Sequence, residues 1–281
     1  MKMRNETKTA MLDLKAELVG RCKSCKGRGW LLSEDPGTSN PCRCMLILRY
    51  LTTLIDAKIP RDYWWIGIDD LEVNEDYLTV CRFYNEHMDK AMKRAFGILF
   101  FGANGIGKTS MQCAIGKEAV VHGYNVQYFT AQQYIEARKS TDDTLAKEYE
   151  SGKVILLDEM DKVYIKAQTN YVTKTLEDFL RRKTADGASF IICTNHDQET
   201  LMNVFGQSTA SLLQRHLKFV DVEGEDYSEK LQARWDSLME TDESYYAEQI
   251  TSMAQRLMDR EIAEEEEDDH EWQKICNRKA Q

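Results

Sequence analysis

Short apolar runs alternate with amphipathic stretches through the middle of the chain. The apolar runs are four or five residues long and comprise residues 98–101, 126–130, 154–157, 190–194 and 219–222. Stretches with helical spacing begin between them, near Lys108, Ala131, Tyr171 and Glu199. Continuous apolar runs are typical of strands buried on both faces, and their alternation with helices predicts a parallel sheet. The pattern therefore predicts an α/β fold, a three-layer sandwich with a parallel central sheet between helices.

The regions on either side of this domain are helical. Residues 1–20 and 45–57 show helical patterns, and Pro60 should end the second of these helices. After Tyr227 the pattern is again helical, apart from an acidic run over residues 264–269. These changes in pattern predict three parts. They are an N-terminal helix with a small module over residues 1–58, an α/β domain over residues 59–227 and an acidic helical extension over residues 228–281.

The composition excludes some classes of protein. Of the 281 residues, 42% are hydrophobic and 30% are charged, which suits a folded domain with a solvated surface. No stretch approaches the roughly 20 uncharged apolar residues that a membrane-spanning helix needs. The first 20 residues lack the apolar run of a secretion signal. We therefore expect a cytoplasmic protein without a membrane partner.

Charge is distributed unevenly along the chain. Residues 1–50 hold ten Lys and Arg against five Asp and Glu, whereas residues 228–281 hold seven against fifteen. The net charge of −10 therefore averages a basic beginning and an acidic end. For this reason the total charge does not indicate whether the protein binds nucleic acid.

The strongest motif follows the first predicted strand. Its sequence, G-A-N-G-I-G-K-T, fits the phosphate-loop pattern G-x4-G-K-[ST], and a helical stretch follows it. The glycines allow backbone N–H groups to turn toward phosphate oxygens, and the helix N-terminus favours an anion. We expect Lys108 to reach the β- and γ-phosphates of ATP and the Thr109 hydroxyl to bind Mg²⁺. The predicted nucleotide-binding residues of the loop are Gly102, Ala103, Asn104, Gly105, Ile106, Gly107, Lys108, Thr109 and Ser110.

Two other predicted strands end in polar residues, at the edge where open parallel sheets bind their ligands. Asp158 follows the strand 154–157 and is expected to hold Mg²⁺ through water, while Glu159 polarises the water that attacks the γ-phosphate. Asp161 is expected to be a solvated charge. Asn195 follows the strand 190–194 and could bond to the γ-phosphate or the attacking water, or could cap the next helix.

These motifs resemble the Walker A, Walker B and sensor 1 elements of AAA+ ATPases. Within that superfamily, residues 59–227 are similar to the bacterial and phage helicase loaders of the DnaC and DnaI kind, with IstB transposition ATPases as relatives. The sequence I-P-R-D-Y from Ile59 to Tyr63 is similar to the segment that cups the adenine in these loaders. The resemblance implies that Ile59 and Tyr63 lie beside the base. E-G-E-D-Y, residues 223–227, is similar to the family's closing motif.

One position departs from the loader pattern. Where the family carries a Ser-Arg-Leu triplet, this chain has Ser211 followed by Leu212. In the family, that arginine reaches the γ-phosphate bound by a neighbouring subunit. Arg215 lies one helical turn further on and could act in its place, or could form a surface salt bridge.

Four of the eight cysteines form a second motif near the N-terminus. Their spacing is C-x2-C-x16-C-x-C, and four thiolates complete a tetrahedral Zn²⁺ site that leaves no position open for water. The alternative is four buried structural thiols, which the basic residues around them disfavour. The spacing therefore predicts a structural zinc site, with ligands Cys22, Cys25, Cys42 and Cys44.

The sequence of this module fits two kinds of partner. Its basic residues, together with Trp30, suit nucleic acid through phosphate contact and stacking, or an acidic protein surface. Loaders of the DnaI kind also carry an N-terminal zinc module, which contacts the replicative helicase. The resemblance therefore slightly favours a protein partner.

The resemblance implies a function that depends on ATP, Mg²⁺ and Zn²⁺. We expect ATP-dependent loading of a hexameric replicative helicase onto single-stranded DNA in a bacterial or phage-infected cell, with self-association on helicase or DNA as a further possibility. One alternative is an ATPase that targets transposition or recombination. Another is a zinc-bearing adaptor in which the nucleotide acts as a switch without appreciable hydrolysis.

Overall fold

The computed structural model describes residues 5–32, 39–163, 170–205, 207–224, 226, 250–260 and 262–263. Its residues cluster into two compact units. One comprises Met1–Asp56, Val121–Gly123 and Glu243–Gln281, and the other comprises Ala57–Val120 and Tyr124–Asp242. The division into three parts expected from the sequence stays a prediction. Tyr227 and the acidic run lie outside the described residues.

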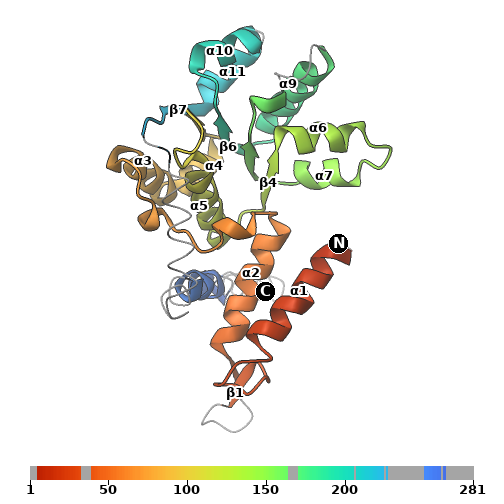
Figure 1. Ribbon diagram of the computed structural model, residues 1–281, viewed down its shortest axis with the longest axis vertical. Helices are drawn as coiled ribbons and strands as arrows, with labels where there is room; N and C mark the ends of the chain where they lie inside the picture. The colour runs from red at the N-terminus through yellow and green to blue at the C-terminus, as the bar shows by residue number, and fades with distance from the viewer. Residues whose placement is uncertain are drawn as a thin grey trace, which may run out of the picture. The chain divides into compact units, whose positions relative to one another are not determined.

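The larger unit contains a sheet of five parallel strands, in the order β4-β5-β6-β3-β7 (Figure 1). All five predicted strands are present, and their ends differ from the prediction by two residues at most. They are β3 (Gly97–Phe101), β4 (Val126–Thr130), β5 (Val154–Asp158), β6 (Ser189–Thr194) and β7 (Leu217–Asp221). The predicted α/β fold with a parallel central sheet is confirmed.

Helices cover both faces of this sheet (Figure 1). Leu99 and Phe101 of β3 belong to a core shared with helices on one face. On the other face, Gln112 of the helix after β3 donates a hydrogen bond to the Ile191 carbonyl of β6 at 2.7 Å. Both faces are therefore buried, which explains the continuous apolar runs. The helices are α5 (Lys108–Val121), α6 (Ala131–Lys139), α7 (Thr144–Glu150), α9 (Asn170–Ala185), α10 (Gln198–Val204) and α11 (Gln207–His216).

A chain segment with short helices precedes β3. Pro60 begins it, and Asn74 caps its first α-helix by accepting the Asp76 N–H at 3.0 Å. Arg82 pairs with Asp69 at 2.8 Å and so ties this helix to the turn before it. The elements are η1 (Arg61–Tyr63), η2 (Ile68–Asp70), α3 (Glu75–Glu86) and α4 (Met88–Lys93).

The smaller unit combines helices with a short antiparallel ribbon. Its elements are α1 (Asn5–Leu18), β1 (Trp30–Leu32), β2 (Ser39–Pro41) and α2 (Arg43–Asp56). Residues 250–260 are helical, and the Tyr50 hydroxyl of α2 contacts the Met253 sulfur at 3.2 Å. Within the described part of the chain, no helix combines the length and the apolar character that membrane crossing requires.

Candidate active site and metal centre

The phosphate-loop motif forms the turn between β3 and α5. Gly102 has a φ of +138°, and a Cβ there would lie 2.2 Å from the Val222 carbonyl oxygen. Gly105 and Gly107 also have positive φ, at 79° and 87°. Left-handed residues turn consecutive N–H groups toward one side of the chain, and the N-terminus of α5 adds its partial positive charge. The loop therefore has the backbone geometry of an anion cradle.

Lys108 lies at the start of α5 and is only 7% exposed. Its Nζ donates to the carbonyl oxygens of Gly102 and Ala103, at 2.8 and 2.5 Å, and to Asn195 Oδ1 at 3.0 Å. Burial lowers the pKa of Lys108, while the nearby acidic groups act in the opposite direction. A buried ammonium among neutral oxygens is well placed to pair with the charge of a phosphate.

Asp158 ends β5 beside the first turn of α5. Its Oδ2 accepts the Thr109 hydroxyl at 3.0 Å and the Tyr128 hydroxyl at 2.9 Å. Burial raises the pKa of Asp158, and these hydrogen bonds partly offset the effect. A carboxylate and a hydroxyl oxygen at this distance are the hard ligands that Mg²⁺ prefers, so the pair fits the ion. The sequence motifs did not indicate Tyr128, which reaches Asp158 because β4 lies next to β5.

Glu159 has a left-handed backbone, with a φ of 50°. This conformation is uncommon for a residue with a side chain and is concentrated at functional sites. Its N–H donates to Asp158 Oδ1 at 2.7 Å, and its carboxylate pairs with the Lys162 ammonium. Both Glu159 and Lys162 line the cavity at the phosphate loop. Lys162 is a residue that sequence reasoning missed, although its i+3 spacing from Glu159 was a usable signal.

Asp161 is buried, with 3% of its surface exposed, and the expectation of a solvated charge is wrong. Its two carboxylate oxygens accept the backbone N–H and the side-chain Nδ2 of Asn195, both at 2.9 Å. The Met160 N–H donates to the Cys193 carbonyl at 3.1 Å, and this hydrogen bond links the turn after β5 to the end of β6. Asn195 does not cap the next helix, because Asp197 holds that position.

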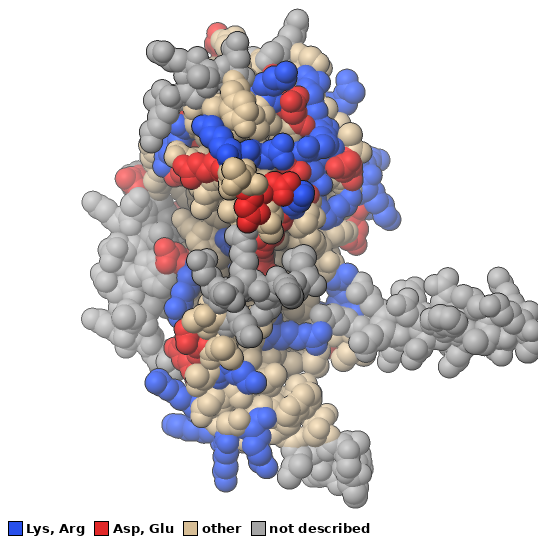
Figure 2. Space-filling view, turned by 90° about the vertical axis from the view of Figure 1, so that its right-hand side faces the viewer, with Lys and Arg blue, Asp and Glu red and all other residues tan. Residues whose placement is uncertain are grey.

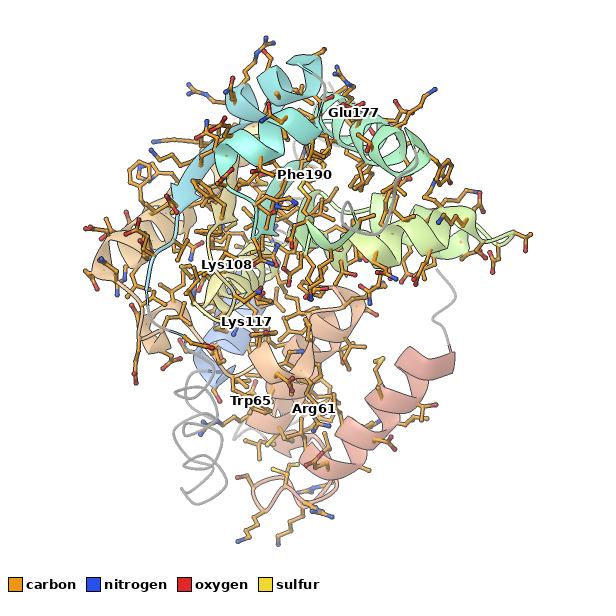
Figure 3. The ribbon with its side chains drawn as sticks, turned by 45° about the horizontal axis from the view of Figure 1, so that its top comes forward. Arg61, Trp65, Lys108, Lys117, Glu177 and Phe190 are labelled. Carbon is orange, nitrogen blue, oxygen red and sulfur yellow. The ribbon has the colours of Figure 1, made fainter. Side chains whose placement is uncertain are left out.

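These side chains surround a cavity of about 190 Å³ at the carboxyl ends of β3, β5 and β6. Most of the predicted nucleotide residues line it, and Tyr63 is the one aromatic residue among its described lining. Ile59, the other residue predicted to lie beside the base, is buried and is not part of this lining; its carbonyl accepts the Trp64 indole N–H at 2.8 Å. Arg215 is exposed on α11 and does not line the cavity of its own chain. Figure 3 marks the position of Lys108.

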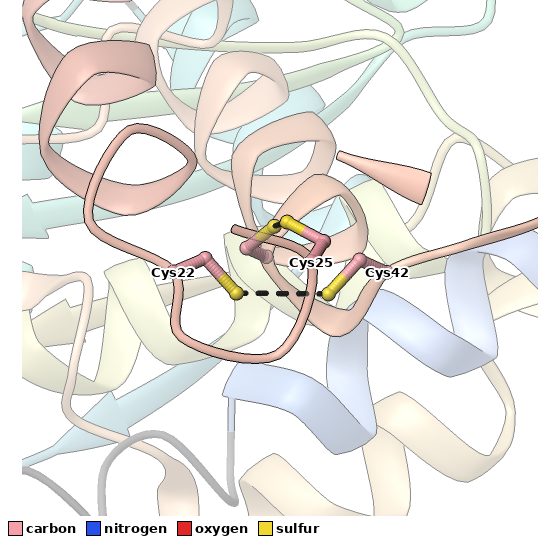
Figure 4. Close-up of side chains that lie close together, drawn as sticks. Cys22, Cys25 and Cys42 are labelled. Carbon is pink, nitrogen blue, oxygen red and sulfur yellow. Dashed lines mark hydrogen bonds between the residues drawn. The ribbon is translucent and has the colours of Figure 1, made fainter. Parts of the chain in front are cut away.

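The four predicted zinc ligands come together in the smaller unit (Figure 4). All four sulfur atoms lie within 4.8 Å of one another. Cys22 and Cys42 are 3.7 Å apart, and Cys25 and Cys44 are 3.6 Å apart. Four sulfurs at this separation fit a tetrahedral zinc ion.

The electrostatics of the cluster also suit a metal. Burial by itself raises the pKa of Cys25, but hydrogen bonds from the Gly29 N–H and neighbouring thiols lower it to about 6. The Gly29 N–H lies 3.1 Å from the Cys25 sulfur and stabilises a thiolate there. Burial raises the pKa values of Cys42 and Cys44, so their deprotonation would depend on the cation.

Cationic side chains surround the cysteine cluster, and Figure 2 shows Lys and Arg gathered on this end of the surface. Trp30 is 49% exposed on β1. The described residues 19–32 and 39–50 contain no Asp or Glu. The surface is therefore suited to an anionic partner. The exposed cations are Arg21, Lys23, Lys26, Arg28, Arg43 and Arg49.

Comparison with known families agrees with the geometry of the larger unit. The model of the ATPase family associated with various cellular activities (AAA) matches residues 98–217. The chain contains an AAA ATPase domain. This AAA domain holds β3 to β6, the phosphate loop, Asp158, Glu159 and Asn195.

One curated protein is similar to about half of this chain. A putative ATP-binding protein of insertion sequence IS5376 from Geobacillus stearothermophilus is 28% identical over 144 residues, which cover 48% of this chain. The match spans 56% of that relative, so the chain covers just over half the length of the curated relative it matches.

Solved structures share the fold of the AAA domain. The DnaC helicase loader superposes with a TM-score of 0.51 and 16% identity, over 58% of this chain and 100% of the loader chain. A DnaI structure gives a TM-score of 0.51 and 15% identity, over 59% of this chain and 93% of the DnaI chain. At these identities the likeness concerns the fold alone.

Proposed function

We propose that the protein binds and hydrolyses ATP in order to load a hexameric replicative helicase onto single-stranded DNA. One observation carries the proposal: Lys108, Thr109, Asp158 and Asn195 meet at one cavity of an AAA domain. The similarity of the fold to the DnaC and DnaI loaders supports the choice of helicase loading.

Each site residue would have a distinct part in hydrolysis. The loop N–H groups and Lys108 would bind the phosphates, and Thr109 and Asp158 would hold Mg²⁺, which supplies charge neutralisation at the phosphates. Glu159 would orient the attacking water after its carboxylate leaves Lys162. Asn195 would contact the γ-phosphate from the position that Asp161 gives it.

Assembly would supply the remaining elements. Arg215 is exposed on α11 and is therefore accessible to a neighbouring subunit, in place of the arginine that Leu212 replaces. The zinc module, with its cationic surface, would contact the helicase. A homo-oligomer on helicase or DNA would bring Arg215 to the nucleotide of the adjacent copy.

A second function is favoured by one specific observation. The relative from insertion sequence IS5376 matches about half of the chain at 28% identity, which supports a transposition ATPase of the IstB kind. Such a protein would bind DNA in an ATP-dependent manner without any helicase. The third possibility is a zinc-bearing adaptor in which the nucleotide acts as a switch. It would bind ATP without appreciable hydrolysis, which distinguishes it from the loader and from the transposition ATPase.

Loading can be tested with the full chain, the replicative helicase of its host and a circular single-stranded DNA. We expect helicase to become bound to the DNA circle only with ATP and the unaltered protein, and not with a Lys108→Ala variant, which loses the phosphate contact. Association of the protein with DNA alone, with no effect on helicase loading, would contradict the loader function and favour the transposition alternative.

The Asp161–Asn195 pair gives a separate prediction. Asp161→Ala and Asn195→Ala should each lower ATP turnover about tenfold, because both disturb the position of one amide group. The double variant should be no slower than the slower single variant. Steady-state turnover with saturating ATP tests this expectation, and additive losses would mean that Asp161 does not act through Asn195.

A further inference from the structure

Lys117 is a buried cation that the proposed reaction does not use. It lies on α5 and is 1% exposed. Its Nζ donates to the carbonyl oxygens of Tyr63 at 2.7 Å, Trp64 at 3.2 Å and Ile66. Three carbonyl groups of the short segment 63–66 thus converge on one ammonium group, which fixes the segment through its backbone.

Placing a lysine here has an energetic cost. Burial lowers the pKa of Lys117 to about 8, although Cys113, Asp70 and Glu118 act in the opposite direction. Apolar residues often fill such a position at lower cost than a desolvated charge. An ammonium group can donate hydrogen bonds to all three carbonyls, whereas an apolar side chain can donate none.

Within the segment that Lys117 holds, Tyr63 forms part of the cavity wall. Its ring is of the kind on which nucleic-acid bases stack. In the same segment, the Trp64 indole N–H donates to the Ile59 carbonyl at 2.8 Å. Figure 3 shows Lys117 between Lys108 and the segment that carries Arg61 and Trp65.

A single helix, α5, therefore contacts both the phosphate loop and the segment that carries Tyr63. Lys108 stands at the first turn of α5, and Lys117 follows nine residues later, about 13 Å further along the helix axis at about 1.5 Å per residue. Lys117 is thus too far from the loop to touch phosphates. It acts on the segment that carries Tyr63, through the carbonyls of Tyr63, Trp64 and Ile66.

We propose that Lys117 is a positioning residue that fixes the Tyr63 wall to the phosphate-loop helix and so determines how much the base contributes to nucleotide affinity. The inference rests on the proposed nucleotide binding. Loss of the ammonium should loosen the wall and weaken base contacts, while the phosphate loop continues to bind triphosphate.

The test compares two ligands that differ in the nucleoside. Affinities of ATP and of inorganic tripolyphosphate, each with Mg²⁺, are measured by calorimetry on the full chain and on Lys117→Met. We expect the variant to bind ATP about tenfold more weakly, the size of one base-stacking contact. Its affinity for tripolyphosphate should stay within about twofold, whereas a general loss of structure would weaken both ligands.

Two further variants make the test decisive. Gln112→Met removes another buried donor of α5, the one that bonds to the Ile191 carbonyl, and should leave the ratio of the two affinities unchanged. Lys117→Gln retains N–H donors and should recover part of the ratio, and it replaces Lys117→Met if that variant does not fold.

The outcomes separate the inference from the proposed function. Equal weakening of both ligands by the Lys117 variants, or no weakening, overturns the positioning role. Equal affinity of the unaltered protein for ATP and tripolyphosphate also overturns it. If the unaltered protein binds neither ligand, the proposed nucleotide binding itself is wrong.

Discussion

A Glu159→Gln variant should bind ATP as the unaltered protein does, while its rate of hydrolysis falls at least about 100-fold. The amide keeps the size of the side chain but accepts a proton poorly and polarises water less than a carboxylate. Asp158, Thr109 and Lys108, which would hold Mg²⁺ and the phosphates, keep their own contacts. Binding and turnover should therefore separate in this variant.

The measurement pairs ATP calorimetry with single-turnover hydrolysis, in the presence of helicase and DNA so that assembly is complete. Glu177→Gln makes the same chemical exchange on α9, away from the lining of the cavity, and should leave both quantities unchanged. Normal hydrolysis by Glu159→Gln would assign the orientation of water to another group.

The unaltered protein should contain one zinc ion per chain, and Cys25→Ser should weaken zinc binding at least about 100-fold. Cys25 is fully buried, and its sulfur accepts the Gly29 N–H, so a serine hydroxyl there replaces a thiolate with a poor zinc ligand. Because the segment around the cysteines has little apolar core, loss of the metal should also loosen the β1–β2 ribbon.

Metal content by mass spectrometry and amide exchange in residues 22–32 test the two parts of this expectation. Cys81→Ala, which removes a buried thiol in α3 outside the cluster, should retain the full zinc content. A chain purified without zinc that shows the same amide protection as the zinc-loaded chain would indicate that the four thiols pack without a metal.

Local patterns were sufficient for the five strands of the sheet and for the helices that begin near Lys108, Ala131, Tyr171 and Glu199, but not for α3, α4, α7 and α11. The apolar run that became β4 was predicted with its observed ends, and the helix start at Lys108 coincides with the N-terminus of α5. Both follow from short-range rules, because β-branched and aromatic residues concentrated in a short run favour a strand, and the glycine spacing of a phosphate loop fixes where the next helix begins. The ribbon β1–β2 had no such signal, since its strands are only three residues long.

The spacing of the cysteines along the chain also identified the four that the structure brings together. Cys22 and Cys25 form a close pair in sequence, as do Cys42 and Cys44, and the fold joins the two pairs in one cluster. In contrast, the burial of Asp161 could not be read locally. Its neighbour Asn195 lies 34 positions away, and only the adjacency of β5 and β6 brings the two together.

By itself, the sequence determined the α/β class, the loop that can bind phosphate and the four thiols that can bind zinc, because each depends on the kind and spacing of nearby residues. Tertiary structure alone decided which side chains touch. Tyr128 reaches Asp158 across neighbouring strands, and Lys117 reaches three carbonyls of a distant segment. Such contacts depend on strand order and helix packing, which bring together residues that are far apart in the chain.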